Sequence, residues 1–184
     1  AGLAASRRLL DRDIRPVLLD RSREPGGRAA TVTLAGRDGR VARCDAGAQY
    51  FTAKDERFAW QVHDWLDRGL AVNWCRGFAA AGKPHEPGEH PRYRGAAGMV
   101  SLTRDLARGL EIRAPLRVQS LRPVGDGWQA VCEHDGHTAA GDAVILTPPP
   151  PECLRLLDTC GLGETSAAER LADIAYDPCL AVNW

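Results

Sequence analysis

A run of apolar residues that ends in a carboxylate, residues 16–20, follows closely on a segment whose apolar residues have helical spacing. The first segment places Leu3, Leu9 and Leu10 among small residues, which suits a helix packed against a sheet. The run that follows, Pro-Val-Leu-Leu-Asp, is typical of a buried parallel strand. A helix that leads into a parallel strand predicts an α/β fold, and we expect a further strand before the helix.

The rest of the chain predicts a series of strands and helices separated by turns. Residues 30–34 and 41–44 indicate a hairpin around a Gly-Arg-Asp-Gly turn. The other predicted helices are residues 54–68, 98–110, 152–157 and 166–174, and the other predicted strands are residues 70–74, 116–123, 128–133 and 138–146. The last three strands follow one another through glycine-containing turns and therefore predict a meander. Residues 82–91 read as an exposed loop, and the four prolines at 148–151 mark a boundary.

Both ends of the chain indicate that it is part of a longer protein. The predicted helix begins directly after Ala1, and residues 178–184 resemble the beginning of a strand. We therefore expect the 184 residues to be an excerpt that lacks a central strand of its sheet. Because the loss of such a strand exceeds the roughly 5 to 15 kcal/mol of stability that a domain has, we expect this piece to fold poorly and to be inactive alone.

Composition narrows the classes of function. The chain has 24 Lys and Arg against 24 Asp and Glu, so it offers no net field for nucleic acid or an anionic membrane surface. No apolar run approaches the roughly 18 to 20 residues that span a bilayer, and no signal segment opens the chain. The six cysteines are scattered without a CxxC pair, which predicts single thiols. We expect a cytoplasmic protein that acts on a small molecule.

The glycine at the start of the first helix and the aspartate at the end of the first strand form a recognisable pair. Gly2 and Asp20 are 18 residues apart, as in the second half of a βαβ unit that binds a dinucleotide. In such units the glycine permits close helix–strand packing, the helix N-terminus faces a pyrophosphate, and the carboxylate binds ribose hydroxyls. The pair alone is weak, because the first two glycines of G-x-G-x-x-G are absent and many strands end in Asp.

Further motifs extend this pair along the chain. The segment DRSREPGGR, residues 20–28, resembles the element of flavin-dependent amine-oxidase-like proteins in which paired glycines let the backbone run beside FAD. The segments DAGAQYFT (45–52), YRGAAGM (93–99) and YDPCLA (176–181) follow in the order typical of the renalase-like branch of that group. On these motifs the chain resembles the renalase-like NAD(P)/FAD-dependent oxidoreductases over nearly its whole length.

This resemblance implies an architecture and a cofactor. The fold class it implies is α/β, with a GR2-type FAD-binding Rossmann-like domain that contains the β-meander, plus part of a second α+β substrate domain. Residues 1–54 and 93–149 would form the FAD-binding domain, and residues 55–92 and 150–184 the partial substrate domain. FAD would be the cofactor, with NAD(P)H as a candidate substrate.

The resemblance also carries the family's cofactor-binding positions over to this chain. The matching residues are Gly2, Asp20, Arg21, Gly26, Gly27, Arg28, Ala48, Gln49, Tyr50, Val118 and Thr147. Within this set, Gly2 matches the last glycine of the phosphate fingerprint, Asp20 the ribose carboxylate, and Arg28 a ligand of the phosphates. Residues 48–50 match the segment that passes the isoalloxazine ring. The Val118 backbone would contact adenine, and the strand end at Thr147 would close over the cofactor.

Several residues have an ordinary structural interpretation beside the functional one. Phe51 suits core packing and flavin contact equally, whereas Gln49 is the better flavin candidate because it is polar. We expect Trp60, Trp65, Trp74 and Phe78 to form the core of the second domain, although Trp74 and Tyr93 could face a substrate. His85 and His90 are close in sequence and His134 and His137 flank a turn, but loop histidines beside Pro and Gly are usually solvated, so we assign no metal. No G-x-S-x-G, HExxH or P-loop is present, and no catalytic residue is assigned.

Three hypotheses of function remain open from the sequence. The first is an FAD-dependent oxidoreductase that passes a hydride from an NAD(P)H-like or amine donor to flavin, with dioxygen reduced to hydrogen peroxide. The second is a non-catalytic module that binds a nucleotide without turnover. The third is an incomplete piece with no activity of its own.

Overall fold

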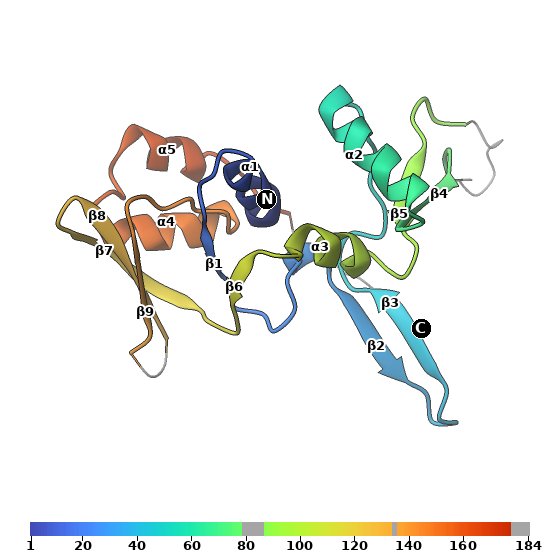
Figure 1. The fold of residues 1–184 in the computed structure, drawn as a ribbon, viewed down its shortest axis with the longest axis horizontal. Coiled ribbons are helices and arrows are strands. Elements are labelled where there is room, and N and C mark those ends of the chain that lie inside the picture. Colours follow the sequence, from blue (N-terminus) through green and yellow to red (C-terminus); the bar gives the residue numbers. More distant parts are fainter. Residues whose placement is uncertain (79–86, 134–135, 178–184) are drawn as a thin grey trace. The chain divides into compact units, whose positions relative to one another are not determined.

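The computed structural model describes residues 1–78, 87–133 and 136–177, and it is a mixed α/β structure (Figure 1). The described residues form two compact units. Unit 1 comprises Ala1–Arg23 and the residues from Gly109 onward, and unit 2 comprises Glu24–Arg108. The chain therefore leaves unit 1 just after the predicted ribose carboxylate, Asp20, and returns to it after α3 (Val100–Ala107).

Unit 1 begins with the predicted helix and strand. Helix α1 (Gly2–Leu10) leads to β1 (Val17–Leu19), which pairs in parallel with β6 (Glu111–Arg113). The expectation of a buried strand is wrong, because Val17 is 40% exposed and the next two residues are half-buried. Among the described residues, β6 is the one strand that pairs with β1, so one edge of β1 has no neighbouring strand.

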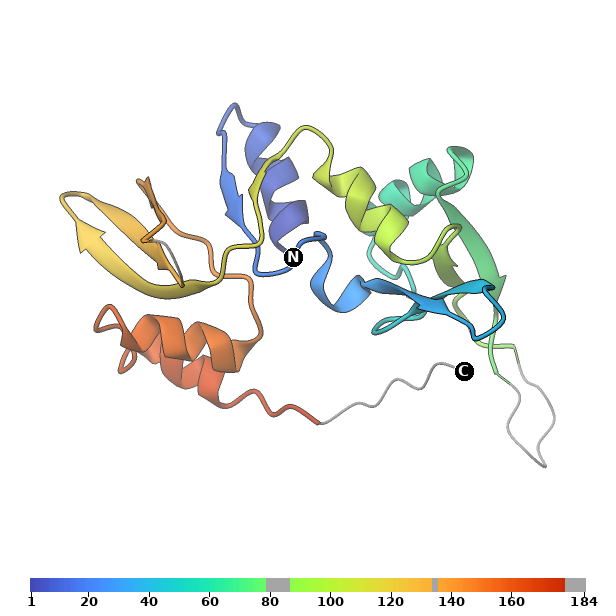
Figure 2. The ribbon, with the colours of Figure 1, turned by 90° about the horizontal axis from the view of Figure 1, so that it is seen from below.

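The second part of unit 1 is the predicted meander with two helices. The strands are β7 (Val118–Val124), β8 (Gly127–Cys132) and β9 (Thr138–Gly141), and the helices are α4 (Pro150–Asp158) and α5 (Ser166–Ala172). Strand β9 ends at Gly141 rather than at residue 146, because Gly141 pairs with Trp128 and β8 offers no further pairing beyond its first residues. Figures 1 and 2 show α4 and α5 side by side. Leu121, Ala130 and Leu156 form the core between meander and helix.

Unit 2 contains the predicted hairpin and two amphipathic helices. Its elements are the 3-10 helix η1 (Gly27–Ala29), β2 (Thr31–Ala35), β3 (Val41–Asp45), α2 (Glu56–Asp67), β4 (Ala71–Cys75), β5 (Arg92–Gly95) and α3 (Val100–Ala107). Strands β2 and β3 pair with each other, as do β4 and β5, both pairs antiparallel. Helix α2 begins where the Asp55 carboxylate accepts hydrogen bonds from the N–H groups of Arg57 and Phe58, and Gly69 follows its end with φ +67°.

The core of unit 2 confirms one predicted tryptophan and corrects others. Trp65 is buried with Val62, Ala71, Met99 and Leu102. The prediction was wrong for Trp60, which is 77% exposed, because its position on α2 lies about 140° around the helix from Trp65. It was also wrong for Trp74 and Phe78, which are 43% and 52% exposed. Phe51 packs against the core through rings of Phe58, Trp65 and Tyr93.

Some expectations concern residues or functions that the structure does not test. The strand expected at 178–184, residues 82–86 of the loop expected at 82–91 and the end of the YDPCLA motif lie outside the described residues. The two compact units do not follow the predicted division into a FAD-binding and a substrate domain, and that functional division stays a prediction. No helix in the described ranges is both long enough and apolar enough to cross a membrane.

Candidate dinucleotide-binding residues

Two predicted cofactor residues of unit 1 lie against each other at the start of α1. A Cβ added to Gly2 would lie 3.0 Å from Oγ1 of Thr147, so the absence of a side chain is what permits this approach. No side chain caps α1, and its first turn therefore leaves backbone N–H groups without an intrahelical acceptor. Such groups, together with the helix dipole, favour an anionic group at this end of the helix.

Asp20 is held by its backbone, and its side chain keeps one oxygen available. Its N–H donates to the carbonyl of Arg113 at 3.1 Å, and its carbonyl accepts from the N–H of Leu116 at 2.7 Å. Oδ1 accepts a hydrogen bond from the N–H of Ser22 at 2.8 Å, while no described residue donates to Oδ2. The half-buried carboxylate can therefore accept further hydrogen bonds from a ligand's hydroxyl groups.

The other two predicted residues of unit 1 are engaged with α4. The Arg21 guanidinium pairs with the Glu152 carboxylate at 2.6 Å, and the Val118 carbonyl accepts a hydrogen bond from Arg155 at 3.2 Å. A carbonyl oxygen has two lone pairs, so this bond leaves Val118 capacity for a second donor. Sequence reasoning missed Glu152 and Arg155, because their partners lie 131 and 37 residues away.

The paired glycines of unit 2 adopt backbone conformations that favour glycine. Gly26 has φ +139° and Gly27 has φ +53°. A Cβ on Gly26 would lie 2.7 Å from Oγ1 of Thr103, whereas a Cβ on Gly27 would meet nothing within 4 Å. The Thr103 hydroxyl oxygen lies 3.1 Å from the Pro25 carbonyl and 3.0 Å from the Val100 carbonyl, so its one hydrogen can be donated to either, and the turn lies against α3. The absence of a side chain at Gly26 thus lets the backbone lie close to α3, and the space beside Gly27 is unoccupied.

The structure brings the glycine turn together with the predicted flavin segment. The N–H of Ala48 donates to the carbonyl of Arg28 at 2.9 Å, and the N–H of Ala46 donates to the carbonyl of Ala30 at the same distance. Gly47 lies between them, where the Arg28 carbonyl occupies the space of a Cβ. The Arg28 side chain is exposed and has no hydrogen-bond or ion-pair partner within the described ranges. Its guanidinium is therefore free to bind an anionic ligand.

Asp45 joins the hairpin to the start of α3. Its Oδ1 accepts from the Thr31 hydroxyl at 2.6 Å and from the N–H of Met99 at 2.8 Å. The N–H of Val100 in turn donates to the Thr31 hydroxyl at 3.1 Å. Since Met99 itself makes no side-chain cap, these two hairpin residues satisfy the first N–H groups of α3. The DAGAQYFT and YRGAAGM motifs therefore meet through this contact.

Tyr50 belongs to a group of exposed aromatic rings. Its neighbour Gln49 is also exposed. The Tyr50 ring centroid lies 5.9 Å from that of Trp74 and 5.4 Å from that of Phe78. The Arg92 guanidinium carbon lies 4.5 Å from the Phe78 centroid and 5.3 Å from the Tyr50 centroid, within cation–π range. We call Tyr50, Trp74, Phe78 and Arg92 the aromatic–arginine cluster. Arg92 was not predicted; its position beside Tyr93 in a short strand is the signal that could have indicated it.

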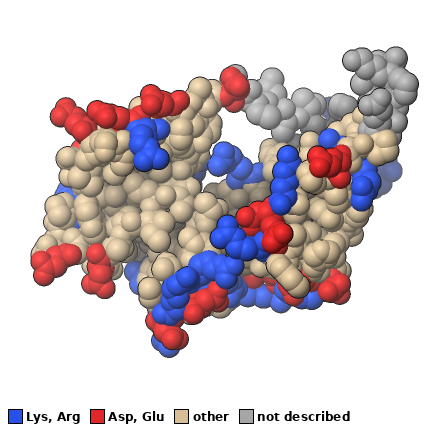
Figure 3. All heavy atoms as spheres, turned by 90° about the horizontal axis from the view of Figure 1, so that it is seen from above, with Lys and Arg blue, Asp and Glu red and all other residues tan. Residues whose placement is uncertain are grey.

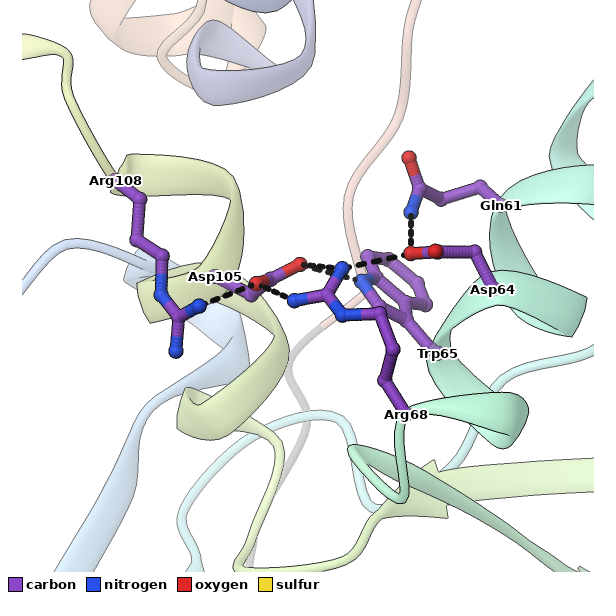
Figure 4. Close-up of polar contacts among 6 residues, drawn as sticks. All are labelled: Gln61, Asp64, Trp65, Arg68, Asp105 and Arg108. Carbon is purple, nitrogen blue, oxygen red and sulfur yellow. Dashed lines mark hydrogen bonds and ion pairs between the residues drawn. The ribbon is translucent and has the colours of Figure 1, made fainter.

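An ion-pair network connects α2 with α3 (Figure 4). Asp105 accepts from Nε1 of Trp65 at 3.0 Å and pairs with Arg68, which also pairs with Asp64 at 2.7 Å. Burial alone would raise the pKa of Asp105, but the hydrogen bonds from Arg68 and Trp65 outweigh it and lower that pKa. The network is structural, since Asp105 is ionised and its described partners belong to the same pair of helices.

The cysteine thiols and the surface hollow add no candidate to the predicted cofactor residues. Cys44, Cys75, Cys132, Cys153 and Cys160 are free thiols, as expected, and burial raises the pKa of Cys132 and Cys153. Within the described ranges, no group of three or more His, Cys, Asp or Glu residues could hold a metal ion.

A surface hollow of about 400 Å³ lies at the β7–β8 turn. Trp128 is one of the residues that line it, and none of the lining residues was predicted to bind a cofactor. Basic and acidic side chains lie side by side on the face in Figure 3.

One known family matches the part of the chain that carries most of these residues. Residues 1–66 match the family model of the NAD(P)-binding Rossmann-like domain. Domains of this family commonly bind FAD or NAD(P) and are typical of oxidoreductases. The match includes Gly2, Asp20, the glycine turn and residues 48–50, and it supports a dinucleotide-binding oxidoreductase.

Proposed function

We propose that this chain belongs to an FAD-dependent oxidoreductase of the renalase-like branch of the flavin amine oxidases. The observation that carries the proposal is the backbone pairing of Arg28 with Ala48, which joins the glycine turn to the segment expected beside the flavin. The contact of Gly2 with Thr147 supports it at the start of α1. When bound, FAD would accept a hydride from a reduced donor and return the electrons to dioxygen as hydrogen peroxide.

The residues of unit 1 suit the nucleotide half of such a cofactor. The first turn of α1 would bind the pyrophosphate, and Gly2 would allow the phosphate oxygens to approach the backbone. The free Oδ2 of Asp20 would accept hydrogen bonds from ribose hydroxyls. The Val118 backbone would contact adenine, and Arg21 would keep its ion pair with Glu152 and position the strand end rather than bind phosphate directly.

Unit 2, taken by itself, carries further residues that the resemblance assigns to FAD binding. Arg28 would pair with the phosphates, because its guanidinium is exposed and free of partners within the described residues. Gly26 and Gly27 would let the backbone pass close to the cofactor, and Ala48 would keep that path clear of bulk. Gln49 would donate to or accept from the polar edge of the isoalloxazine ring.

A nicotinamide is the donor we favour over an amine. The described residues supply exposed aromatic surface at Tyr50, Trp74 and Phe78, which suits a planar ring. Anaerobic addition of NADH or NADPH to the full-length, FAD-loaded protein is expected to bleach the visible flavin band. Air is then expected to restore it with formation of peroxide. An unchanged flavin spectrum with both nucleotides would contradict the nicotinamide assignment and favour an amine as the donor.

A second candidate function is a nucleotide-binding module without turnover. It shares the α1 end, Asp20 and the glycine turn, and no catalytic acid, base or nucleophile has been identified among the described residues. It predicts tightly bound nucleotide with no reduction by any donor. The bleaching experiment therefore separates the two functions.

Arg28→Gln tests the cofactor assignment directly. Loss of a charge-assisted hydrogen bond is expected to weaken FAD binding roughly ten-fold or more in the full-length protein, measured by titrating the apoprotein with FAD. Arg43→Gln is the matched control, because Arg43 is an exposed arginine of the neighbouring β3 and is expected to leave FAD affinity unchanged. Equal affinity in the wild type and Arg28→Gln would contradict the assignment of Arg28.

A further inference from the structure

The aromatic–arginine cluster lies on the side of β4 and β5 that faces away from the core. Successive side chains of a strand point to opposite faces, and Tyr93 packs with Phe51 and Trp65 in the core. Its neighbour Arg92 therefore projects from the other face. Tyr50, which precedes the core residue Phe51, contacts Arg92 there.

A β-bulge adds Trp74 to the same face. In the register of β4 and β5, Asn73 pairs with Tyr93 and Cys75 pairs with Arg92, so β4 takes two steps where β5 takes one. Trp74 is the extra residue of this bulge, and bulges often redirect a side chain next to a functional site. The redirected ring contacts both Tyr50 and Phe78, at centroid distances of 5.9 and 5.4 Å.

The rings of this cluster leave much of their surface open. Tyr50 is 37% exposed, Trp74 is 43% exposed and Phe78 is 52% exposed. Their mutual contacts are tilted or edge-on, with interplanar angles of 47°, 64° and 71°. Three rings at such angles present both edges and faces to a planar ligand, which is the way in which aromatic side chains bind other rings.

The Arg92 guanidinium has no hydrogen-bond acceptor among the residues that the structure describes. Within the described part of the chain, its guanidinium makes no hydrogen bond or ion pair, and its contacts are the rings of Phe78 and Tyr50. One of its nitrogens, Nη1, is fully buried with no hydrogen-bond partner. A guanidinium that is desolvated in this way and lacks an anion is unfavourable unless a partner arrives.

We propose that the aromatic–arginine cluster is a binding site for a planar ring that carries a carboxylate. The ring would stack among Tyr50, Trp74 and Phe78, and the carboxylate would pair with Arg92. The carboxylate belongs on the ring itself, because the Arg92 guanidinium lies within ring-contact distance of Phe78 and Tyr50. Binding of such a ligand does not depend on FAD, whereas its role as an analogue that competes with the neutral nicotinamide donor rests on the proposed oxidoreductase function.

Nicotinate and nicotinamide form a matched pair of probes for this site. The two share one ring and differ in a carboxylate against a neutral amide. We expect the full-length protein to bind nicotinate about ten-fold more tightly than nicotinamide, measured by calorimetry or ligand-observed NMR. Equal binding of the two probes, or binding of neither, would overturn the proposal.

Variants of the cluster keep the test decisive. Arg92→Gln is expected to abolish the preference for nicotinate while nicotinamide affinity is retained, and Arg92→Lys is expected to keep part of the preference. Trp74→Leu is expected to weaken both probes equally. Arg43→Gln is the control and should change neither. A preference for nicotinate that survives in Arg92→Gln would contradict the proposal.

The result is separable from the proposed cofactor. The probes are titrated into both flavin-free and FAD-loaded protein. FAD binding without a preference for nicotinate would overturn the carboxylate site and leave the proposed function standing. A preference for nicotinate in a protein that binds no FAD would support the site and contradict the proposed function.

Discussion

Gly26 and Gly27 both have positive φ, but only Gly26 is crowded by a neighbouring side chain. Substitution at Gly27 therefore tests backbone strain alone, and substitution at Gly26 tests strain together with crowding. Gly27→Ala adds a Cβ in open space at φ +53°, so it is expected to lower the free energy of unfolding by about 1 to 2 kcal/mol. Gly26→Ala places an L side chain at φ +139°, outside the left-handed helical region, and also puts a Cβ only 2.7 Å from Oγ1 of Thr103, so its cost is expected to be larger. Urea unfolding measures the free energy of unfolding of each variant and shows which of the two is less stable.

A rescue variant identifies the crowding contact. Thr103→Ala removes both Oγ1, at 2.7 Å, and the methyl group, at 3.3 Å, that the new Cβ would meet. Compared with Thr103→Ala alone, the double variant is therefore expected to show a smaller cost of Gly26→Ala, whereas the cost of Gly27→Ala is expected to be the same in both backgrounds. A Gly27 variant that is less stable than the Gly26 variant would contradict this account of the turn.

At the scale of elements, Asp105 makes the attachment of α3 to α2 dependent on pH. Hydrogen bonds from Arg68 and Trp65 keep the folded pKa of Asp105 below its ordinary value of 3.8 despite its burial. The stabilisation is therefore fully present above pH 3.8 and is lost as the pH falls through the lower folded pKa. Asp105→Asn is expected to be less stable than the wild type at neutral pH, with a difference that shrinks below pH 3.8.

Denaturant unfolding across this pH range measures the difference between the two proteins. Asp64→Asn is the control, because Asp64 pairs with the same arginine but its side chain is 49% exposed. An exposed pair contributes about 0.2 to 1 kcal/mol, so this variant should differ little from the wild type at any pH. A difference for Asp105→Asn that grew toward low pH would exclude the assigned direction of the shift.

Asp45 links another pair of elements, the hairpin and α3. Asp45→Ala removes the acceptor for the Met99 N–H and for the Thr31 hydroxyl, and it is expected to cost about 1 to 2 kcal/mol of stability. Asp38→Ala at the tip of the same hairpin removes an exposed contact with Arg40 and serves as the control. Hydrogen exchange of the α3 amides should accelerate in the first variant; unchanged exchange there would show that the hairpin does not cap α3.

Periodicity predicted the longer elements well and the short ones poorly. Helices α1, α2 and α3, the hairpin and the meander follow the expected order, because each carries several apolar residues at its own period or a glycine turn. Strands β5 and β6 have four and three residues and present no alternation that could be recognised. The two arginines of β5 are half-buried, whereas Glu111 and Arg113 of β6 are exposed. Their pairing is determined by partners that lie far away in sequence.

The candidate site shows the same division between local signal and distant contact. Gly26 and Gly27 were predictable because positive φ is a local demand that glycine meets. The contacts of Gly2 with Thr147 and of Val118 with Arg155 depend on packing between distant segments. Arg92 was missed for the same reason, since its lack of an acceptor is a property of the folded unit rather than of a motif.

For the protein as a whole, the proposed function depends on FAD binding. The most direct measurement is the visible spectrum of the purified full-length protein that carries this sequence, with chromatography of the nucleotide released on denaturation. We predict a flavin spectrum and FAD in stoichiometric amount, either as purified or after addition of FAD. A colourless protein that FAD does not reconstitute would contradict the proposed function.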